Sequence, residues 1–264
     1  MGTGGSRVAD VAYLTSLRVA PQNVFQAESA MRALFHALAV EEFDAGGVET
    51  YAIHRDPADE GAYQIYEQYT SAADRRHLTG PQSREAWTAV LARVIAPFER
   101  VLLEPLGVFG RAKAVGGDLT GDEAWRFTIR ALPDSAGVMD ATMDAIMDAM
   151  AIDEFNFAEV KSYTAHRIAG DAGGYVMYEH FSGLGSARHA TGPTLTVAAR
   201  PFAAHTVTPF ARQLLHPLYA YGIDHKSWGG HTASTDHTAS TDHTAATVPP
   251  LPADRPNYQR HGRL

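Results

Sequence analysis

One pattern of residues occurs twice in the chain, and its two occurrences are always 112 positions apart. Tyr51 is matched in this way by Tyr163, and Arg-His-Leu-Thr-Gly-Pro at 76–81 is matched by Arg-His-Ala-Thr-Gly-Pro at 188–193. The spacing is constant over about 18–110, so neither copy has gained or lost a residue there. A repeat of this kind predicts two copies of one small domain in tandem. Positions with the same residue in both copies are therefore the first candidates for a functional role.

The length of the chain fits two domains and a tail. We predict a flexible N-terminus at 1–9, domains at 10–112 and 122–224, and a low-complexity tail at 225–264 that contains many His, Thr and Pro residues. Each domain is long enough to bury a hydrophobic core of its own. The tail has too few apolar residues to do so, and the Gly- and Ser-containing start has no hydrophobic signal region.

Composition argues against several classes of protein. The net charge of −8 disfavours nucleic acid or an anionic membrane as the main partner. The absence of cysteine excludes disulfides, thiolate catalysis and Cys-ligated zinc, and it fits a cytoplasmic protein. No apolar run is long enough to span a membrane. The histidines show no metal-ligand spacing, and no nucleotide-binding glycine motif or Gly-x-Ser-x-Gly is present.

Both copies follow one order of predicted elements. In the first copy, residue periodicity predicts strands at 11–19, 48–54, 62–70 and 101–109 and helices at 22–43 and 81–98. In the second, it predicts strands at 124–132, 159–167, 175–181 and 215–221 and helices at 138–155 and 193–212, the last kinked at Pro201. This β-α-β-β-α-β order is the ferredoxin-like unit, whose sheet has one bare face. The expected fold is therefore α+β, with two tandem ferredoxin-like units packed sheet to sheet as an intramolecular dimeric α+β barrel.

Three groups of residues together resemble a known family. They are Tyr51 with Arg55 on the second strand, Tyr66-Glu67-x-Tyr69 on the third, and Arg76-His77 before the second helix. This constellation resembles the antibiotic biosynthesis monooxygenase domain, which usually forms a homodimeric α+β barrel. Both copies, about 200 of the 264 residues, resemble that domain. The resemblance implies a monomer that is a pseudo-dimer, or a homodimer of such chains.

The resemblance also implies an activity. It points to an oxygenase of antibiotic biosynthesis that acts on a polycyclic aromatic polyketide phenol or hydroquinone, by ring hydroxylation, quinone formation or oxidative C–C ring opening. Similar enzymes include anthrone oxidases, which resemble cofactor-free enzymes, and angucycline B-ring-opening oxygenases, which are associated with reduced flavin. The implied cofactor is O2, with or without FADH2 or FMNH2 from a separate reductase, and no metal. Two alternatives stay open: a non-catalytic binder of a small aromatic or haem, and a polyketide cyclase on the same barrel.

The third strand of each copy supplies the first candidate catalytic residues. Side chains alternate along a strand, so Glu67 shares a face with Tyr69, and the resemblance places that face toward the helices and the substrate cavity. A carboxylate among aromatic rings is partly desolvated, which raises a carboxyl pKa and suits a general base. Glu67 and its counterpart Glu179 are the predicted bases. The structural alternative is an ion pair with the arginine at 76 or 188.

Histidines follow the third strand at the same distance in both copies. His77 and His189 are predicted catalytic residues, because a neutral imidazole can accept a phenolic proton and then donate a hydrogen bond to reduced oxygen. The structural alternative is a histidine that joins strand to helix. His54 and His166 lie on the second strand, each beside an arginine on the opposite face, and polar residues of the barrel interface are their simpler interpretation.

Aromatic and methionine side chains are the predicted contacts for a flat substrate or cofactor ring. Aromatic rings on strands are also common core residues, and methionine adapts to irregular ligands as well as to irregular cores. Either copy, or both, can carry the activity on this evidence. The predicted binding residues are Tyr51, Tyr63, Tyr69, Tyr163, Tyr175, Met177, Phe181, Met143 and Met147.

Overall fold

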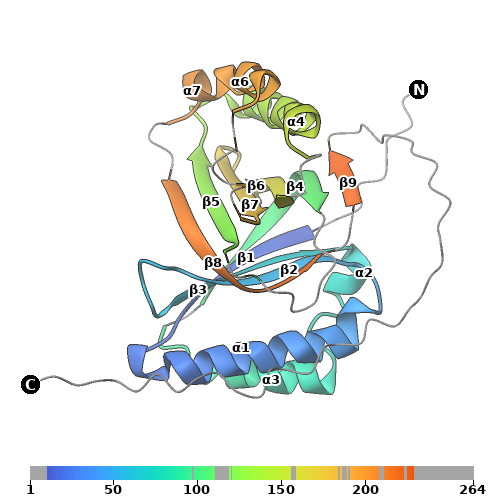
Figure 1. Cartoon of the computed structure of the whole chain (residues 1–264), viewed down its shortest axis with the longest axis vertical. Helices are drawn as coiled ribbons and strands as arrows, with labels where there is room; N and C mark the ends of the chain where they lie inside the picture. The colour runs from blue at the N-terminus through green and yellow to red at the C-terminus, as the bar shows by residue number, and fades with distance from the viewer. Residues whose placement is uncertain are drawn as a thin grey trace, which may run out of the picture. The chain divides into compact units, whose positions relative to one another are not determined.

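The computed structural model contains both copies of the predicted β-α-β-β-α-β unit (Figure 1). The residues that the structure describes all belong to one compact unit, Met1–Ala233. The predicted N-terminal segment 1–9 and the tail beyond residue 228 lie outside them, as does Arg188. The described residues are 11–96, 98–110, 119, 121–155, 159–183, 185, 189, 191–207, 211–222 and 225–228.

The first copy differs from the sequence prediction mainly in its helices. The predicted helix at 22–43 is a 3-10 turn, an α-helix and a π-helical turn, and the second helix ends at Leu91 rather than near residue 98. It ends early because Val94 forms a β-bridge with Val19 at the end of the first strand. The elements are β1 (Val11–Arg18), η1 (Pro21–Asn23), α1 (Val24–Leu38), η2 (Ala39–Phe43), β2 (Val48–Arg55), β3 (Ala62–Tyr69), α2 (Ser71–Asp74), α3 (Pro81–Leu91) and β4 (Glu99–Gly110).

The second copy has the same order with a broken second helix. The helix predicted at 193–212 is divided just before Pro201, and its predicted end is wrong because Thr206 already bridges to Ala131 and residues 211–212 belong to a strand. A short strand at His225–Trp228 was not predicted. The elements are β5 (Glu123–Arg130), α4 (Ala136–Asp153), β6 (Val160–Ile168), β7 (Gly174–Phe181), α6 (Pro193–Ala198), α7 (Arg200–His205), β8 (Ala211–Gly222) and β9 (His225–Trp228).

The last strand of each copy joins the two sheets into one barrel. The first part of β4 pairs with β1 of its own copy, and the rest pairs with β6 of the other copy. In the same way β8 pairs first with β5 and then with β2. The antiparallel order β1-β3-β2-β8-β5-β7-β6-β4 therefore returns to β1, and β9 adds to β4. The predicted intramolecular α+β barrel is confirmed, and the exchange of strands makes each sheet depend on both copies.

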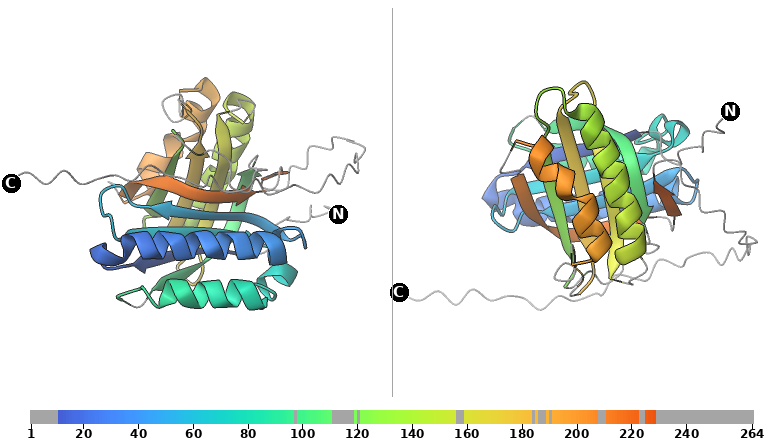
Figure 2. Two further views of the ribbon diagram at one scale, coloured as in Figure 1. Left: turned by 60° about the horizontal axis from the view of Figure 1, so that its bottom comes forward. Right: turned by 90° about the horizontal axis from the view of Figure 1, so that it is seen from above.

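Helices cover the barrel on two opposite sides. Figure 2 shows α1 and α3 side by side beneath one sheet, and α4 beside α6 and α7 over the other. Apolar residues accordingly form one cluster under each helix pair and a third inside the barrel. Every residue of β7 is buried, as expected for a strand with a packed layer on both faces. The cluster inside the barrel consists of Ala12, Leu14, Tyr66, Leu103, Ala124, Val176, Tyr178 and Leu215.

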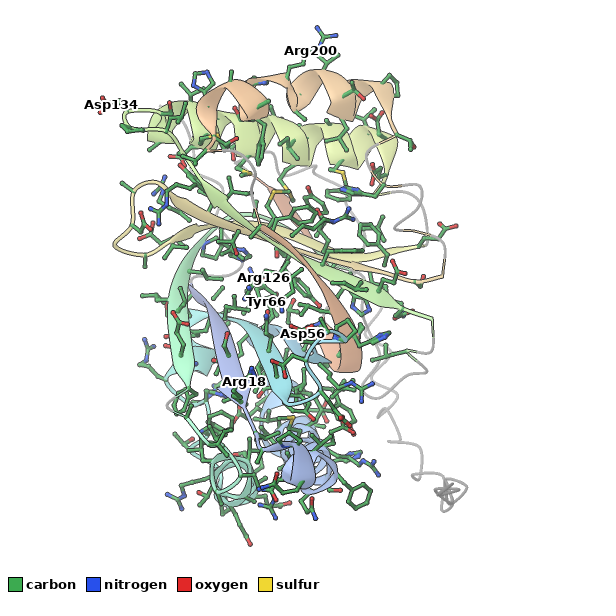
Figure 3. The ribbon with its side chains drawn as sticks, turned by 90° about the vertical axis from the view of Figure 1, so that its left-hand side faces the viewer. Arg18, Asp56, Tyr66, Arg126, Asp134 and Arg200 are labelled. Atoms are coloured by element: carbon green, nitrogen blue, oxygen red, sulfur yellow. The ribbon has the colours of Figure 1, made fainter. Side chains whose placement is uncertain are left out.

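Two histidine–tyrosine pairs cross the barrel interior from one copy to the other. His54 Nε2 lies 2.8 Å from the hydroxyl of Tyr178, and the hydroxyl of Tyr66 lies 2.9 Å from His166 Nε2. The two tyrosine rings stack with centroids 4.5 Å apart, and Figure 3 shows Tyr66 between the sheets. Burial lowers the pKa of His54 to about 3 and that of His166 to about 4. Both imidazoles are therefore neutral, and the predicted interface role of these histidines agrees with the structure.

We expect Tyr178→Phe to lower the free energy of unfolding by about 1–3 kcal/mol, because it leaves a fully buried imidazole nitrogen of His54 without its hydrogen-bond partner. Urea unfolding followed by circular dichroism measures this loss. In the double variant with His54→Phe the hydrogen bond is already absent, so the tyrosine substitution should cost less there. Equal costs in the two backgrounds would show that the pair contributes nothing.

Candidate functional site

In the first copy, four predicted or neighbouring polar side chains form one hydrogen-bonded chain under α1. His77, after α2, places Nδ1 2.9 Å from Oε2 of Glu42 in η2. The hydroxyl of Tyr69 on β3 lies 3.2 Å from the same nitrogen and donates to Oε2 of Glu67 at 3.4 Å. The tyrosine hydroxyl therefore lies between the histidine and the predicted base.

An arginine of β4 completes this chain. Arg100 Nη2 donates to Oε2 of Glu67 at 2.7 Å, and its guanidinium carbon lies 3.6 Å from the centroid of the Tyr13 ring. Burial by itself lowers the pKa of Arg100, but attraction to Glu67 outweighs it and raises the pKa. The ion pair considered from sequence therefore exists for Glu67, with a different arginine. Arg76 instead donates to the carbonyl oxygen of Gly46.

In the second copy the corresponding groups are connected differently. His189 Nδ1 lies 2.8 Å from Oε2 of Glu154, and its Nε2 lies 3.5 Å from Oε1 of Glu179. Phe181 stands where the first copy has Tyr69, so the hydroxyl that Tyr69 supplies is missing here. The hydroxyl near Glu179 is that of Tyr163, whose pKa is raised by burial and by the charge of and hydrogen bond to this carboxylate. Among the described residues, Oε2 of Glu179 has no hydrogen-bond partner although the side chain is 1% exposed.

The arginine that matches Arg100 does not approach this glutamate. The guanidinium carbon of Arg212 lies 3.7 Å from the ring centroid of Trp125 and 5.3 Å from that of Phe127. The imidazole of His189 supplies the only ion pair to Glu179 among the residues that the structure describes. The two predicted bases therefore have different counter-ions, a guanidinium in one copy and an imidazolium in the other.

Two carboxylates hold the second histidine in its charged form. Burial by itself lowers the pKa of His189, but hydrogen bonds to Glu154 and Glu179 and the attraction of both carboxylates raise it to about 10. A charged imidazole donates a proton and cannot accept one. At neutral pH the second copy therefore presents a cation at His189, and Glu179 is the group that can act as base.

The predicted aromatic residues divide into those near the histidines and those far from them. The ring centroids of Tyr51 and His77 are 6.0 Å apart, and those of Tyr163 and His189 are 5.8 Å apart. The phenylalanine ring of Phe181 lies 5.2 Å from His189. These rings, with the Tyr69 ring, form the walls of the two sites.

Tyr63 and Tyr175 lie at the other end of their strands. Each is four positions from its glutamate, which is about 13 Å along a strand. Their hydroxyls donate to Glu28 and Asp140 at 3.3 Å and 3.0 Å. Both are therefore away from the histidine end of the site. The predicted methionines Met143, Met147 and Met177 belong to the core cluster under α4.

Two carboxylates of the sites were missed from sequence. Glu42 and Glu154 follow the first long helix of each copy and are themselves 112 positions apart, so the repeat would have found them. Their neighbours in the chain cap the second helices: Glu41 accepts the N–H groups of Gln82 and Ser83 at the start of α3. In each copy, carboxylates at the end of the first long helix therefore bind both the histidine and the first backbone N–H groups of the second helix.

The shared Thr-Gly-Pro segment follows from these caps. Asp153 accepts the N–H of Leu195 at the start of α6. A Cβ atom at Gly80 or Gly192 would meet the capping carboxylate of Glu41 or Asp153 at less than contact distance. Glycine lets the chain pass the carboxylate closely, and the proline after it begins the helix.

Two surface openings differ in size. A pocket of about 180 Å³ in the first copy includes Glu42 and Arg76 in its lining. An open groove of about 530 Å³ in the second copy lies between α4 and α6; it is lined by Ile152, two residues before Glu154 in the chain, but not by Glu179 or His189. The groove is lined by Ala145, Asp148, Ala149, Ile152, Pro193, Thr194, Val197 and Ala198.

Within the described part of the chain, no group of three or more His, Asp or Glu side chains is placed to hold a metal ion. None of the described helices has the length and apolar character needed to cross a membrane.

Comparison with known proteins identifies the fold. No known family profile and no curated protein matches the sequence. The structure is similar to a "putative monooxygenase" from Lactobacillus acidophilus NCFM, with 10% identity, a TM-score of 0.72, and coverage of 83% of this chain and 99% of the other. It is also similar to a "putative monooxygenase" from Fusobacterium nucleatum, with 13% identity, a TM-score of 0.70, and coverage of 83% and 98%. The chain therefore shares the whole fold of these two proteins.

Proposed function

We propose that the protein is a cytoplasmic oxygenase of the antibiotic biosynthesis monooxygenase type that oxidises a polycyclic aromatic phenol or hydroquinone with O2. One observation carries the proposal: a buried glutamate and a histidine lie together beside aromatic rings, at matching places in both copies. The fold shared with two proteins named as monooxygenases supports it, and the resemblance of the sequence motifs supplies the substrate class.

The proposed chemistry begins with removal of a proton. A glutamate takes the proton of a phenol, or of the CH2 group of its anthrone tautomer, and the negative charge spreads over the ring system. This anion gives one electron to O2, and the resulting carbon radical and superoxide combine to form a C–O bond. The peroxide is protonated, the remaining C–H proton is removed, and the O–O bond breaks. The CH2 carbon becomes a C=O group, and the second oxygen atom leaves as water.

The surroundings of the glutamates suit this sequence of charges. Negative charge passes from the carboxylate to the ring and then to oxygen, and a nearby cation stabilises it at each stage. His189 is such a cation in the second copy. The aromatic side chains Tyr163 and Phe181 beside it are buried and exclude water, which strengthens the electrostatic interaction.

The described residues of the two sites do not fit the phosphate of a flavin. Each site holds two glutamates around its histidine, and in the first copy the guanidinium of Arg100 already pairs with Glu67. An anionic phosphate needs free cations or a row of backbone N–H groups. We therefore derive no step through flavin, and the experiment below treats it as one arm.

Oxygen uptake by the pure protein tests the proposal. With an anthrone or a polycyclic hydroquinone, we expect enzyme-dependent uptake and an oxygenated product by mass spectrometry without any flavin. Parallel reactions contain reduced flavin, and reduced flavin with substrate but no protein corrects for its own reaction with oxygen. Product only with flavin would replace the cofactor-free mechanism. Conversion that proceeds equally without oxygen would identify a cyclase, and no conversion with a Soret band on haem titration would identify a binding protein.

A further inference from the structure

We propose that the reaction takes place in the second copy, with Glu179 as the base and His189 as the cation, and that the first copy keeps the matching residues in a structural role. This rests on the proposed function, because it names which of two equivalent sites performs it. The copies have kept the same glutamate and histidine, but the surroundings of these residues differ.

The first difference is the position of the shared arginine. In the first copy, Arg100 lies 2.7 Å from Oε2 of Glu67 and neutralises it. The guanidinium occupies this oxygen and would have to be displaced before a substrate proton could reach it. In the second copy, Arg212 lies against the Trp125 ring, and Glu179 has no guanidinium beside it among the described residues.

The second difference is one hydroxyl group. Tyr69 donates to the same oxygen of Glu67 that binds the arginine, so this oxygen is occupied twice. Phe181 cannot donate, and Oε2 of Glu179 is left buried and without a hydrogen-bond partner among the described residues. Buried polar atoms without partners are rare and costly in folded proteins. A phenolic O–H is a donor that would satisfy this oxygen.

The second copy also has an open apolar groove on its surface. It lies between α4 and α6 with a volume of about 530 Å³, and its lining does not include Glu179 or His189. The wall of the groove includes the exposed apolar side chains of Ile152 and Val197. Ile152 precedes Glu154, the residue that holds His189. The flat apolar rings of a polycycle suit this surface.

The proposed step is a single proton transfer. The phenolic O–H bond breaks, the proton bonds to Oε2 of Glu179, and the negative charge passes from the carboxylate to the phenolate. His189 keeps its proton and remains the neighbouring cation throughout. Oxygen then acts as the oxidant, in the steps given for the proposed function.

Two glutamine substitutions at matching positions test the assignment. Loss of a general base typically costs a factor of 10²–10⁴, so Glu179→Gln is expected to lower kcat at least about 100-fold with a small change in KM. Glu67→Gln is expected to lower kcat far less. Phe181→Tyr gives the second copy the hydroxyl that Tyr69 has in the first copy, and this substitution should lower kcat. Tyr69→Phe, which removes the hydroxyl from the first copy, should not lower kcat. Circular dichroism confirms that each variant is folded.

An anaerobic binding measurement separates this proposal from the proposed function. Without oxygen, the chain is titrated with a polycyclic phenol and with its methyl ether, which has no O–H to donate. We expect the wild type to prefer the phenol by about tenfold or more, as a hydrogen bond to a charged acceptor would give. Glu179→Gln should lose most of this preference, and Glu67→Gln should keep it.

The outcomes are distinct. An equal or larger effect of Glu67→Gln in either measurement would overturn the assignment to the second copy. The same holds if Glu179→Gln changes neither kcat nor the preference for the phenol. If no phenol is oxidised by the wild type, the proposed oxygenase function fails, and the binding measurement still decides which copy binds the phenol.

Discussion

Replacing His189 with glutamine is expected to lower the free energy of unfolding at pH 7 by about 3–5 kcal/mol. The substitution removes the cation that contacts both Glu154 and Glu179 and leaves these two buried carboxylates without it. Breaking a buried pair by removing one partner costs about this much. Denaturant unfolding followed by tyrosine fluorescence measures the loss. His77→Gln is the matched control and should cost less, because Glu42 keeps the hydrogen bond from the N–H of Leu78.

The same histidine makes the stability depend on pH. The pKa of His189 is about 10 in the folded protein and near 6.5 in the unfolded chain. The folded state therefore holds the proton more tightly, so its contribution is complete below about pH 6.5 and is lost as the pH rises toward 10. We expect the unfolding free energy of the wild type to fall across this window and that of His189→Gln to change less. Parallel curves for the two proteins would contradict the assignment of a charged imidazole.

Replacing Arg100 with methionine is the second change with a large expected effect. It leaves Glu67, whose side chain is 4% exposed, as an unpaired buried carboxylate. Arg100 itself is 35% exposed, so water screens part of the pair, and we expect a loss of about 2–3 kcal/mol rather than the full cost of a buried pair. Thermal and urea unfolding give the value.

The second copy provides the control for this change. Arg212→Met removes a guanidinium that lies over the rings of Trp125 and Phe127, a contact worth about 0.5–1 kcal/mol at an exposed site. In addition, Glu67→Gln should recover part of the loss in the Arg100→Met background, because the unpaired charge is then gone. Equal losses from the two arginine substitutions would show that Glu67 does not depend on its ion pair.

The repeat predicted most of the fold. It required two equal units and two bare sheet faces, and the barrel with helices on both sides follows from these (Figure 1). The exchange of β4 and β8 between the sheets was not predicted, because residue alternation in a strand is the same whichever neighbour it pairs with. The ends of α3 and α7 were missed for a related reason: the bridges of Val94 and Thr206 to distant strands overrode local helical periodicity.

The candidate site was predicted in its residues but not in its connections. Alternation along β3 put Glu67 on one face with Tyr69, the family resemblance placed that face toward the helices, and the matched offset identified His77 and His189. Which arginine meets the glutamate depends on the path of β4 and on a single hydroxyl, present in Tyr69 and absent in Phe181. Such differences between copies arise from packing in three dimensions, and local sequence patterns do not contain them.

The most direct measurement of the central claim is the mass of the product formed under ¹⁸O2. The purified protein is given a polycyclic phenol or anthrone in ordinary water, and the product is analysed before its carbonyl oxygens exchange. We expect one labelled oxygen atom per product molecule, with labelled water as the second product, and formation at least about 100-fold slower when Glu179→Gln replaces the wild type. An unlabelled product, formed at the same rate without oxygen, would contradict the account and show that the barrel performs a reaction other than oxygenation.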